Sequence, residues 1–387
     1  MENFVYRNPT TVYFGKKMEE NVGQIVARYS RNILLHHYGE DVLRIIGIYD
    51  TVIKSLNDAG VKFTELGGVK PNPRLSLVKE GIEICRKEGI DFVLGIGGGS
   101  VIDSSKAIAF GVPYDGDVWD FFIHKAQVQE TLPTGSILTL PGTGSESSLS
   151  CVVTNEDMGY KGSVDIDVIR PEFAILNPEL TMSLPPYQTM CGTFDALSHV
   201  IERYFTDVPN VTVTDLQCES VMKAIIHIGP LQLDDPQNYD YRAEIMWASK
   251  IAHDNSLGVG RIVDWTSHVL GHQISAVCDL AHGASLAIML PAWMKYIYKQ
   301  HIDRFYKFAV NVFKVEPAAM SRELTAYEGI IRLEAFIKRM GLPTRLSEAN
   351  VDASKIPEMT KIFEGRTHGA FHPVNKDDID KIFKLAK

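Results

Sequence analysis

Two hydrophobic patterns follow one another along this 387-residue chain, and their order is the sequence feature that most restricts its fold. Up to about residue 180, short β-branched or apolar runs alternate with stretches of helical periodicity. The run at 92–96 is almost wholly apolar, which is typical of a strand buried on both faces of a parallel sheet. After Pro185 and Pro186, long helical periodicities dominate and strand candidates nearly vanish. The pattern predicts an N-terminal α/β domain with a mostly parallel sheet, followed by an all-helical domain.

The length is consistent with this division, because 387 residues are too many for one ordinary core. We place the boundary near Leu184, with residues 1–184 forming a dinucleotide-binding domain and residues 185–387 a metal-binding, catalytic domain. Strands are expected at 33–36, 61–66, 92–96, 137–140 and 173–176. Helices are expected at 43–59, 75–88, 101–110, 190–204, 213–227, 242–253 and 324–340.

Two glycine-containing loops follow expected strands. The first, GIGGGS at 95–100, precedes a helix, and Ser100 stands where an N-cap is expected. It is not the GxGxxG fingerprint, and taken alone it is either a phosphate loop or a tight turn. The second, PGTGSE at 141–146, favours a dinucleotide, since ligands collect at strand ends in open α/β sheets. Asp103 and Lys106 are either solvated helix charges or face that ligand.

Carboxylate and imidazole side chains recur at helical spacing in the second half. Asp195 and His199 are four residues apart, His268 and His272 repeat that spacing, and His282 follows. A single histidine is usually an ordinary surface or core residue, but this set provides the ligands that a divalent cation needs. Spacing does not decide which histidine stays unligated.

Composition excludes several functions. The net charge of −9 argues against nucleic acid or an anionic membrane as partner, and no apolar run is long enough to span a bilayer. The five cysteines are dispersed and form no CxxC pair, so we expect free thiols in a reducing cytoplasm. No signal peptide is expected at the N-terminus.

Several motifs together resemble the iron-containing (group III metal-dependent) alcohol dehydrogenase family, in family order and over nearly the whole chain. The segment 264–272 is similar to the butanol dehydrogenase and aldehyde reductase branch. The motifs that carry the resemblance are FGK at 14–16, GVKPNP at 68–73, GGGSVID at 97–103, LPGTGSE at 140–146, DALSH at 195–199, DWTSHVLGH at 264–272 and HG at 282–283.

The resemblance implies a dehydroquinate synthase-like architecture and hydride transfer between a nicotinamide cofactor and an alcohol or aldehyde in an interdomain cleft. It assigns the metal, Fe(II) or another divalent cation such as Zn(II), to Asp195, His199, His268 and His282. It places His272 near the nicotinamide and substrate, as the candidate base. It also implies a homodimer with residues 6–14 in the interface. The implied cofactor contacts are Gly97, Gly98, Gly99, Ser100, Asp103, Thr139, Thr143, Ser145 and Lys161.

The cofactor preference is expected to lie in the loop after the first strand of the nucleotide domain. Gly39, Glu40, Asp41 and Val42 stand where NADP-using relatives in this branch carry glycine and serine. An acidic side chain there can bind the adenosine ribose and would repel a 2′-phosphate, so NAD(H) is expected over NADP(H). The alternative is that Glu40 and Asp41 only cap the next helix.

Other functions on this scaffold remain open at this stage. A glycerol-1-phosphate dehydrogenase-like enzyme is the main alternative, and dehydroquinate synthase would need basic residues near the metal, where this chain is apolar or neutral. A non-enzymatic binder would not need both loops and the metal set. Phe194 and Trp265 near the ligands favour a linear aliphatic substrate such as butanol or butanal.

Overall fold

The computed structural model describes residues 1–317 and 321–387. It divides into two compact units, one of residues 7–185 and 236–254, the other of residues 1–6, 186–235 and 255–387. We call the first the α/β unit and the second the helical unit. Among the described residues, no helix is both long and apolar enough to cross a membrane.

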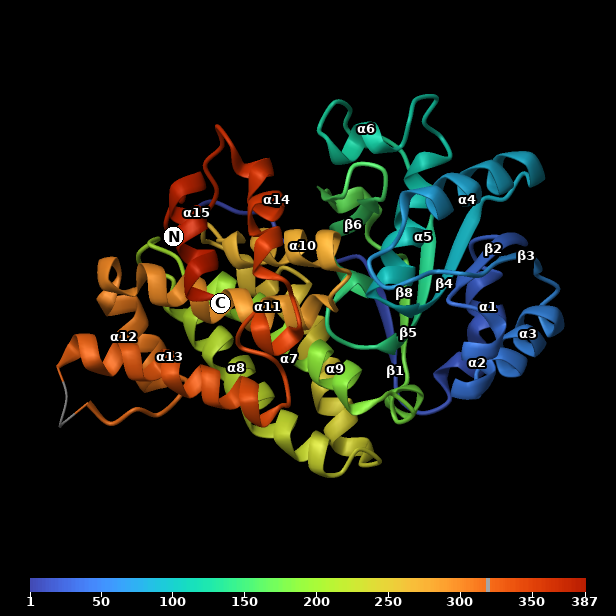
Figure 1. The fold of residues 1–387 in the computed structure, drawn as a ribbon. Helices are drawn as coiled ribbons and strands as arrows, with labels where there is room; N and C mark the ends of the chain where they lie inside the picture. Colours follow the sequence, from blue (N-terminus) through green and yellow to red (C-terminus); the bar gives the residue numbers. More distant parts are fainter. Residues whose placement is uncertain (318–320) are drawn as a thin grey trace. The chain divides into compact units, whose positions relative to one another are not determined.

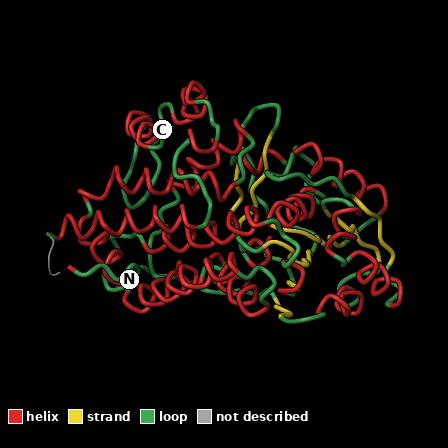
Figure 2. The backbone as a smooth tube through the Cα atoms, turned by 60° about the horizontal axis from the view of Figure 1, so that its bottom comes forward, coloured by secondary structure: helices red, strands yellow, loops and turns green. Residues whose placement is uncertain are grey.

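A six-stranded parallel sheet with strand order β1-β8-β5-β4-β2-β3 forms the centre of the α/β unit (Figures 1 and 2). Its middle strand β4 is buried along its whole length, as the apolar run predicts. An antiparallel hairpin, β6–β7, lies outside this sheet, and the sequence did not reveal it. The strands are β1 Thr11–Phe14, β2 Asn32–His37, β3 Lys62–Leu66, β4 Phe92–Gly98, β5 Thr134–Leu140, β6 Ser150–Asn155, β7 Tyr160–Asp165 and β8 Phe173–Leu176.

Helices cover both faces of the sheet, which accounts for the apolar strands. Val52 and Leu56 pack with Leu35 and Leu94 on one face, whereas Ile82 and other residues form the core on the opposite face. The helix expected at 43–59 is broken in two, because Gly47 adopts a left-handed conformation (φ 81°) that ends the first part. The helices are α1 Val22–Val26, α2 Glu40–Ile46, α3 Tyr49–Asp58, α4 Leu75–Glu88, α5 Gly99–Gly111 and α6 Trp119–Phe122.

The helical unit contains no strand within its described residues, so the predicted fold class is confirmed. One helix after residue 185, α9 Tyr239–His253, groups instead with the α/β unit. Its Met246 packs in a core cluster with Ile102 and Leu138. A single domain boundary between residues 184 and 185 therefore does not describe how α9 is grouped. The helical unit has α7 Pro186–Tyr204, α8 Thr212–Asp234, α10 Thr266–Cys278, α11 His282–Ile297, α12 Ile302–Asn311, α13 Arg322–Arg339, α14 Ile356–Thr360 and α15 Lys376–Leu385.

The N-terminal strand is tied into its own chain. β1 pairs in parallel with β8, from Thr11 opposite Phe173 to Phe14 opposite Leu176. β1 nevertheless forms an edge of the sheet, and the backbone groups on its outer side lack a strand partner in the described chain.

Close approach of two helices in the helical unit depends on one glycine. A Cβ atom at Gly283, in the first turn of α11, would lie 2.1 Å from the carbonyl oxygen of Cys191 and 2.8 Å from its Cα on α7. Backbone atoms cannot move aside as the tip of a side chain can. Any side chain at residue 283 would therefore force the starts of α7 and α11 apart.

We expect Gly283→Ala to destabilise the protein by about 1–3 kcal/mol, because this overpacking outweighs the helix propensity of alanine. Gly271→Ala is the control, since the nearest atom to its Cβ would be the side-chain Cδ2 of Leu286 at 3.1 Å, and the nearest backbone atom would be 3.6 Å away. Urea denaturation of both variants measures the difference. Equal stability of the two variants would contradict the close approach of α7 and α11.

Candidate metal centre and cofactor loops

Three helices of the helical unit bring one carboxylate and several imidazoles together. Asp195 and His199 lie one turn apart on α7, His268 is in the first turn of α10, and His282 begins α11. Asp195, His199 and His268 are buried. Asp195, His268 and His282 each offer a ligand atom, and these three atoms all lie within 4.8 Å of one another.

The imidazoles converge on one oxygen, Oδ1 of Asp195. His268 Nε2 lies 3.7 Å from it, His282 Nε2 3.6 Å and His199 Nδ1 3.5 Å. The ring of His199 is 4.4 Å from that of His268 between centroids, although His199 is not part of the three-residue cluster. Its Nδ1 makes a 2.8 Å hydrogen bond to the backbone oxygen of Asp195, which leaves Nε2 as the acceptor nitrogen.

The residues fit a divalent cation. His268 Nε2 is buried without a hydrogen-bond partner, and an orphaned imidazole nitrogen beside a carboxylate is a natural metal ligand. Burial tends to lower the pKa of His268, but the carboxylates of Glu202 and Asp195 outweigh burial and raise it to about 9. The local field therefore favours positive charge at this position. Among the described residues no cysteine joins the cluster, so oxygen and nitrogen ligands alone would select the metal.

His272 lies beside the cluster and not in it. Its ring is 5.0 Å from that of His282 and 6.4 Å from that of His268, between centroids. It follows His268 by one turn of α10 and is partly exposed, in contrast to His268. The structure thus separates these two histidines, which spacing alone could not do.

Glu202 is not among the residues predicted from the sequence, although it shares a helix face with Asp195 and His199. Glu202 is fully buried, and its Oε2 contacts His268 Nδ1. The available signal was spacing, since positions 195, 199 and 202 repeat at the helical period.

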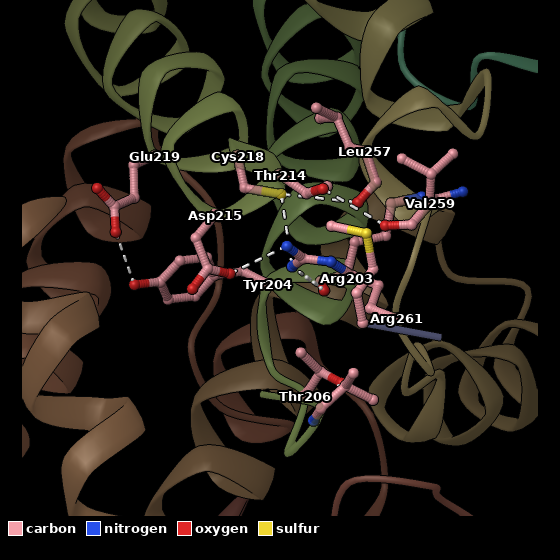
Figure 3. Close-up of polar contacts among 12 residues, drawn as sticks. Arg203, Tyr204, Thr206, Thr214, Asp215, Cys218, Glu219, Leu257, Val259 and Arg261 are labelled. Carbon is pink, nitrogen blue, oxygen red and sulfur yellow. Dashed lines mark hydrogen bonds and ion pairs between the residues drawn. The ribbon is translucent and has the colours of Figure 1, made fainter. Parts of the chain in front are cut away.

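A polar network fixes the carboxyl end of α7 (Figure 3). The Nη1 of Arg261 donates to the backbone oxygen of Arg203 at 2.8 Å, and its Nη2 pairs with Asp215 at 3.0 Å. The Tyr204 hydroxyl donates to Glu219 on α8 at 2.9 Å. Because Arg261 lies just before α10, this network connects the carboxyl end of α7 to the segment that leads into α10. Both helices carry residues of the cluster.

In the α/β unit, the first glycine loop forms the turn from β4 into α5. Gly98 is the N-cap and α5 begins at Gly99, so the expectation that Ser100 would be the N-cap is wrong. A Cβ at Gly99 would lie 2.4 Å from Thr143 Oγ1, so the two glycine loops touch at this point. The N–H of Gly98 donates to the Tyr38 hydroxyl at 3.1 Å.

Asp103 and Ser145, both predicted cofactor contacts, are bonded to each other. The Ser145 hydroxyl donates to Asp103 Oδ1 at 2.5 Å, and the N–H of Val152 donates to Oδ2 at 3.2 Å. Buried Lys106 donates to Ser145 Oγ at 3.0 Å and to the backbone oxygens of residues 148 and 150. Burial raises the pKa of Asp103 and lowers that of Lys106. Lys106 is neither a solvated charge nor a side chain open to a ligand, because it braces the second loop.

The remaining predicted cofactor residues lie at several places in the α/β unit. Thr139 is buried near the end of β5. Buried Lys161 on β7 donates to Asn72 Oδ1 at 2.9 Å. Gly39 is the N-cap of α2, and Glu40 and Asp41 lie in its first turn, as the capping alternative requires. Glu40 also pairs with Arg44 at 2.8 Å.

Comparison with known proteins covers the chain from end to end. The family model for iron-containing alcohol dehydrogenase matches residues 9–178, and that for the C-terminal part of the Fe-containing alcohol dehydrogenase family matches residues 189–387. The chain is similar to probable NADH-dependent butanol dehydrogenase 2 of Bacillus subtilis, with 41% identity over 100% of both chains. It is 31% identical to NADPH-dependent aldehyde reductase YqhD of Escherichia coli, also over 100% of both.

A solved structure gives the same result. The crystal structure of NADH-dependent butanol dehydrogenase A from Thermotoga maritima matches with a TM-score of 0.95 at 35% identity, covering 100% of this chain and 99% of that one. The similarity therefore extends to the backbone of the glycine loops and of the helices that carry Asp195 and the clustered histidines.

The second loop contains a buried acid whose ionisation should affect stability. Both carboxylate oxygens of Glu146 are buried without a hydrogen-bond partner, and burial raises its pKa to about 7. The unfolded chain, with a pKa near 4.5, loses this proton first as pH rises. The neutral acid therefore contributes stability that is fully present below pH 4.5 and is lost as pH rises towards 7.

We expect Glu146→Gln to remove about 3 kcal/mol of this pH dependence, because the amide stays neutral throughout. The measurement is the free energy of unfolding in urea between pH 4.5 and 8, for variant and wild type. Glu83→Gln, with a carboxylate 74% exposed, serves as the control. A parallel pH dependence in wild type and Glu146→Gln would show that Glu146 does not titrate in this range.

Proposed function

Because the chain belongs to the iron-containing alcohol dehydrogenase family, we propose that it transfers a hydride between NAD(H) and a linear aliphatic alcohol or aldehyde such as butanol or butanal. The chain is an NAD(P)-dependent alcohol dehydrogenase of the butanol dehydrogenase branch. The observation that carries the proposal is the convergence of the Nε2 atoms of His268 and His282 on Asp195 Oδ1, with the ring of His199 beside that of His268.

The metal ligands proposed are Asp195, His199, His268 and His282, with Fe(II) as the ion and Zn(II) as a possible substitute. When bound, the cation supplies Lewis acidity towards the alcohol or carbonyl oxygen, and the nicotinamide supplies the hydride acceptor or donor. The chain's own residues hold the ligand nitrogens in place: the backbone oxygen of Asp195 orients His199, and Glu202 contacts His268 Nδ1.

His272 is proposed as the group that exchanges the proton of the substrate hydroxyl. It lies next to the cluster and is partly exposed, so it can pass a proton to solvent. Its ring lies 5.0 Å from that of His282 between centroids, which supports a role beside the proposed ligands.

The cofactor is proposed to bind at the glycine loops. The first amides of α5 follow β4, and a helix N-terminus beyond a strand end suits a pyrophosphate. Gly97, Gly98, Gly99 and Ser100 would contact it, and Thr139, Thr143 and Lys161 are proposed as further contacts. Asp103 and Ser145 are bonded to each other, which supports a role in shaping the second loop.

The glycerol-1-phosphate dehydrogenase-like alternative is not favoured. The similar proteins are butanol dehydrogenases and an aldehyde reductase. The neighbours of the ligands in sequence, Val200, Ile201, Leu270 and Leu286, are buried and apolar, and none could bind a phosphate ester. A kinetic screen of linear C2 to C8 alcohols and aldehydes, with the Fe(II)- or Zn(II)-loaded enzyme, tests the proposal. Turnover of glycerol 1-phosphate in preference to butanol would overturn it.

We expect His268→Ala to lose the metal and all measurable turnover, because the variant lacks a ligand in the centre of the cluster. His272→Ala should lower turnover and keep its metal. Elemental analysis and butanal reduction with NADH measure both properties. Full metal content in His268→Ala would refute the ligand assignment, and metal loss in His272→Ala would refute the separation of roles.

We expect a higher kcat/KM with NADH than with NADPH, because Glu40 and Asp41 would repel a 2′-phosphate. Arg44 could attract one, but it is paired with both Glu40 and Asp50. The Glu40→Gly, Asp41→Gly double variant should lower the NADH-to-NADPH ratio by about tenfold, which corresponds to about 1.4 kcal/mol. Asp58→Asn is the control, since it removes an exposed carboxylate that pairs with Lys54. An unchanged ratio in the double variant would assign both carboxylates to helix capping alone.

A homodimer is proposed, with residues 6–14 in its interface. The open edge of β1 supports this placement, because a second strand could pair there. Light scattering at micromolar concentration should give twice the 43.2 kDa monomer mass. A mass equal to that of the monomer would refute the dimer.

A further inference from the structure

We propose that Glu202 is a positioning residue of the metal centre, which fixes the orientation and the tautomer of His268. This inference rests on the proposed metal site and adds a residue to it. Glu202 lies on α7, seven residues after Asp195 and three after His199, and therefore on the face that carries both. Its side chain is fully buried.

The Glu202 carboxylate is held by the start of α10. Its Oε1 accepts the backbone N–H of Ser267 at 2.7 Å and that of His268 at 3.3 Å. These amides lie in the first turn of α10, where the helix dipole stabilises negative charge. The backbone oxygen of Glu202 also accepts the N–H of Asp264 at 3.3 Å. One residue of α7 thus fixes both the entry into α10 and the direction of its first turn.

With Oε1 occupied by the two amides, Oε2 faces His268 Nδ1. A carboxylate cannot donate a hydrogen bond, so Nδ1–H of His268 must be the donor. In the neutral imidazole, the single ring proton therefore stays on Nδ1. The lone pair is then on Nε2, the nitrogen that lies 3.7 Å from Asp195 Oδ1. The opposite tautomer would place a lone pair against a buried carboxylate, which is strongly unfavourable.

His199 and His268 are oriented by different kinds of acceptor. His199 Nδ1 bonds to a neutral backbone carbonyl, whereas His268 Nδ1 contacts a carboxylate. A carboxylate increases the basicity of the imidazole more than a carbonyl does. Among these two ligands, His268 should therefore depend more on its supporting residue.

Glu202 could instead act only as a cap for α10. Capping would stabilise the protein equally with and without metal, whereas positioning would change the affinity for the metal. Glu202→Gln separates the two roles, because the amide keeps a similar shape and an acceptor oxygen but loses the charge. Glu219→Gln is the matched control, since buried Glu219 accepts bonds from Tyr204 and Asn311 and contacts no histidine of the cluster in the described structure.

The experiment titrates Zn(II) into metal-free full-length protein against a competing chelator. We expect a 10- to 100-fold loss of affinity in Glu202→Gln and a change below about twofold in Glu219→Gln. The increase in melting temperature on adding Zn(II) should also be smaller in Glu202→Gln. Wild-type affinity in Glu202→Gln would overturn the inference, even if the variant were less stable without metal.

A second measurement needs no folded variant. In ¹⁵N-histidine spectra of the Zn(II)-loaded wild type, the nitrogen of His268 that carries a proton should be Nδ1. A proton on Nε2 would overturn the inference. Failure of the wild type to bind Zn(II) or Fe(II) at all would refute the proposed function itself, and the two failures are therefore distinguishable.

Discussion

The burial of Asp195 among imidazoles is the constraint on which the arrangement of the helical unit depends. A carboxylate and several imidazoles removed from water are stable only when they meet one another or a cation. The helices that carry these side chains, α7, α10 and α11, must therefore begin at defined residues and pack against one another in a defined way. The approach of Gly283 to Cys191 and the contact between Glu202 and the start of α10 determine two of those points.

Features outside the cluster maintain this geometry. Arg261 connects the end of α7 to Asp215 on α8 and lies shortly before α10. A shift of α7 or α8 would have to break the hydrogen bond from Arg261 to the backbone oxygen of Arg203 or the ion pair of Arg261 with Asp215, whose two side chains are largely removed from water. These contacts connect the end of α7 to α8 and to the segment that leads into α10, and α7 and α10 carry Asp195, His199 and His268.

The α/β unit uses buried polar groups in a related way. Lys106 bonds to Ser145 and to backbone oxygens beyond it, so a charged side chain gives the second loop its shape. Asp103 joins the same network through Ser145. Asp103 and Ser145 stand in motifs that resemble cofactor-binding sequences, and their hydrogen bond connects α5 to the second glycine loop. The same motif can therefore serve both loop geometry and ligand binding.

The residue pattern alone was sufficient to predict the parallel sheet, most helix positions and the family. Periodicity and ordered motifs are properties of the local sequence, so they can be read without the structure. Spacing also identified the candidate ligand residues. Tertiary contacts alone separated His268 from His272, revealed Glu202 and grouped α9 with the α/β unit. They also showed that Lys106 is a buried brace. These features depend on which faces meet across distant segments, and a pattern along one helix or strand carries no information about its partner.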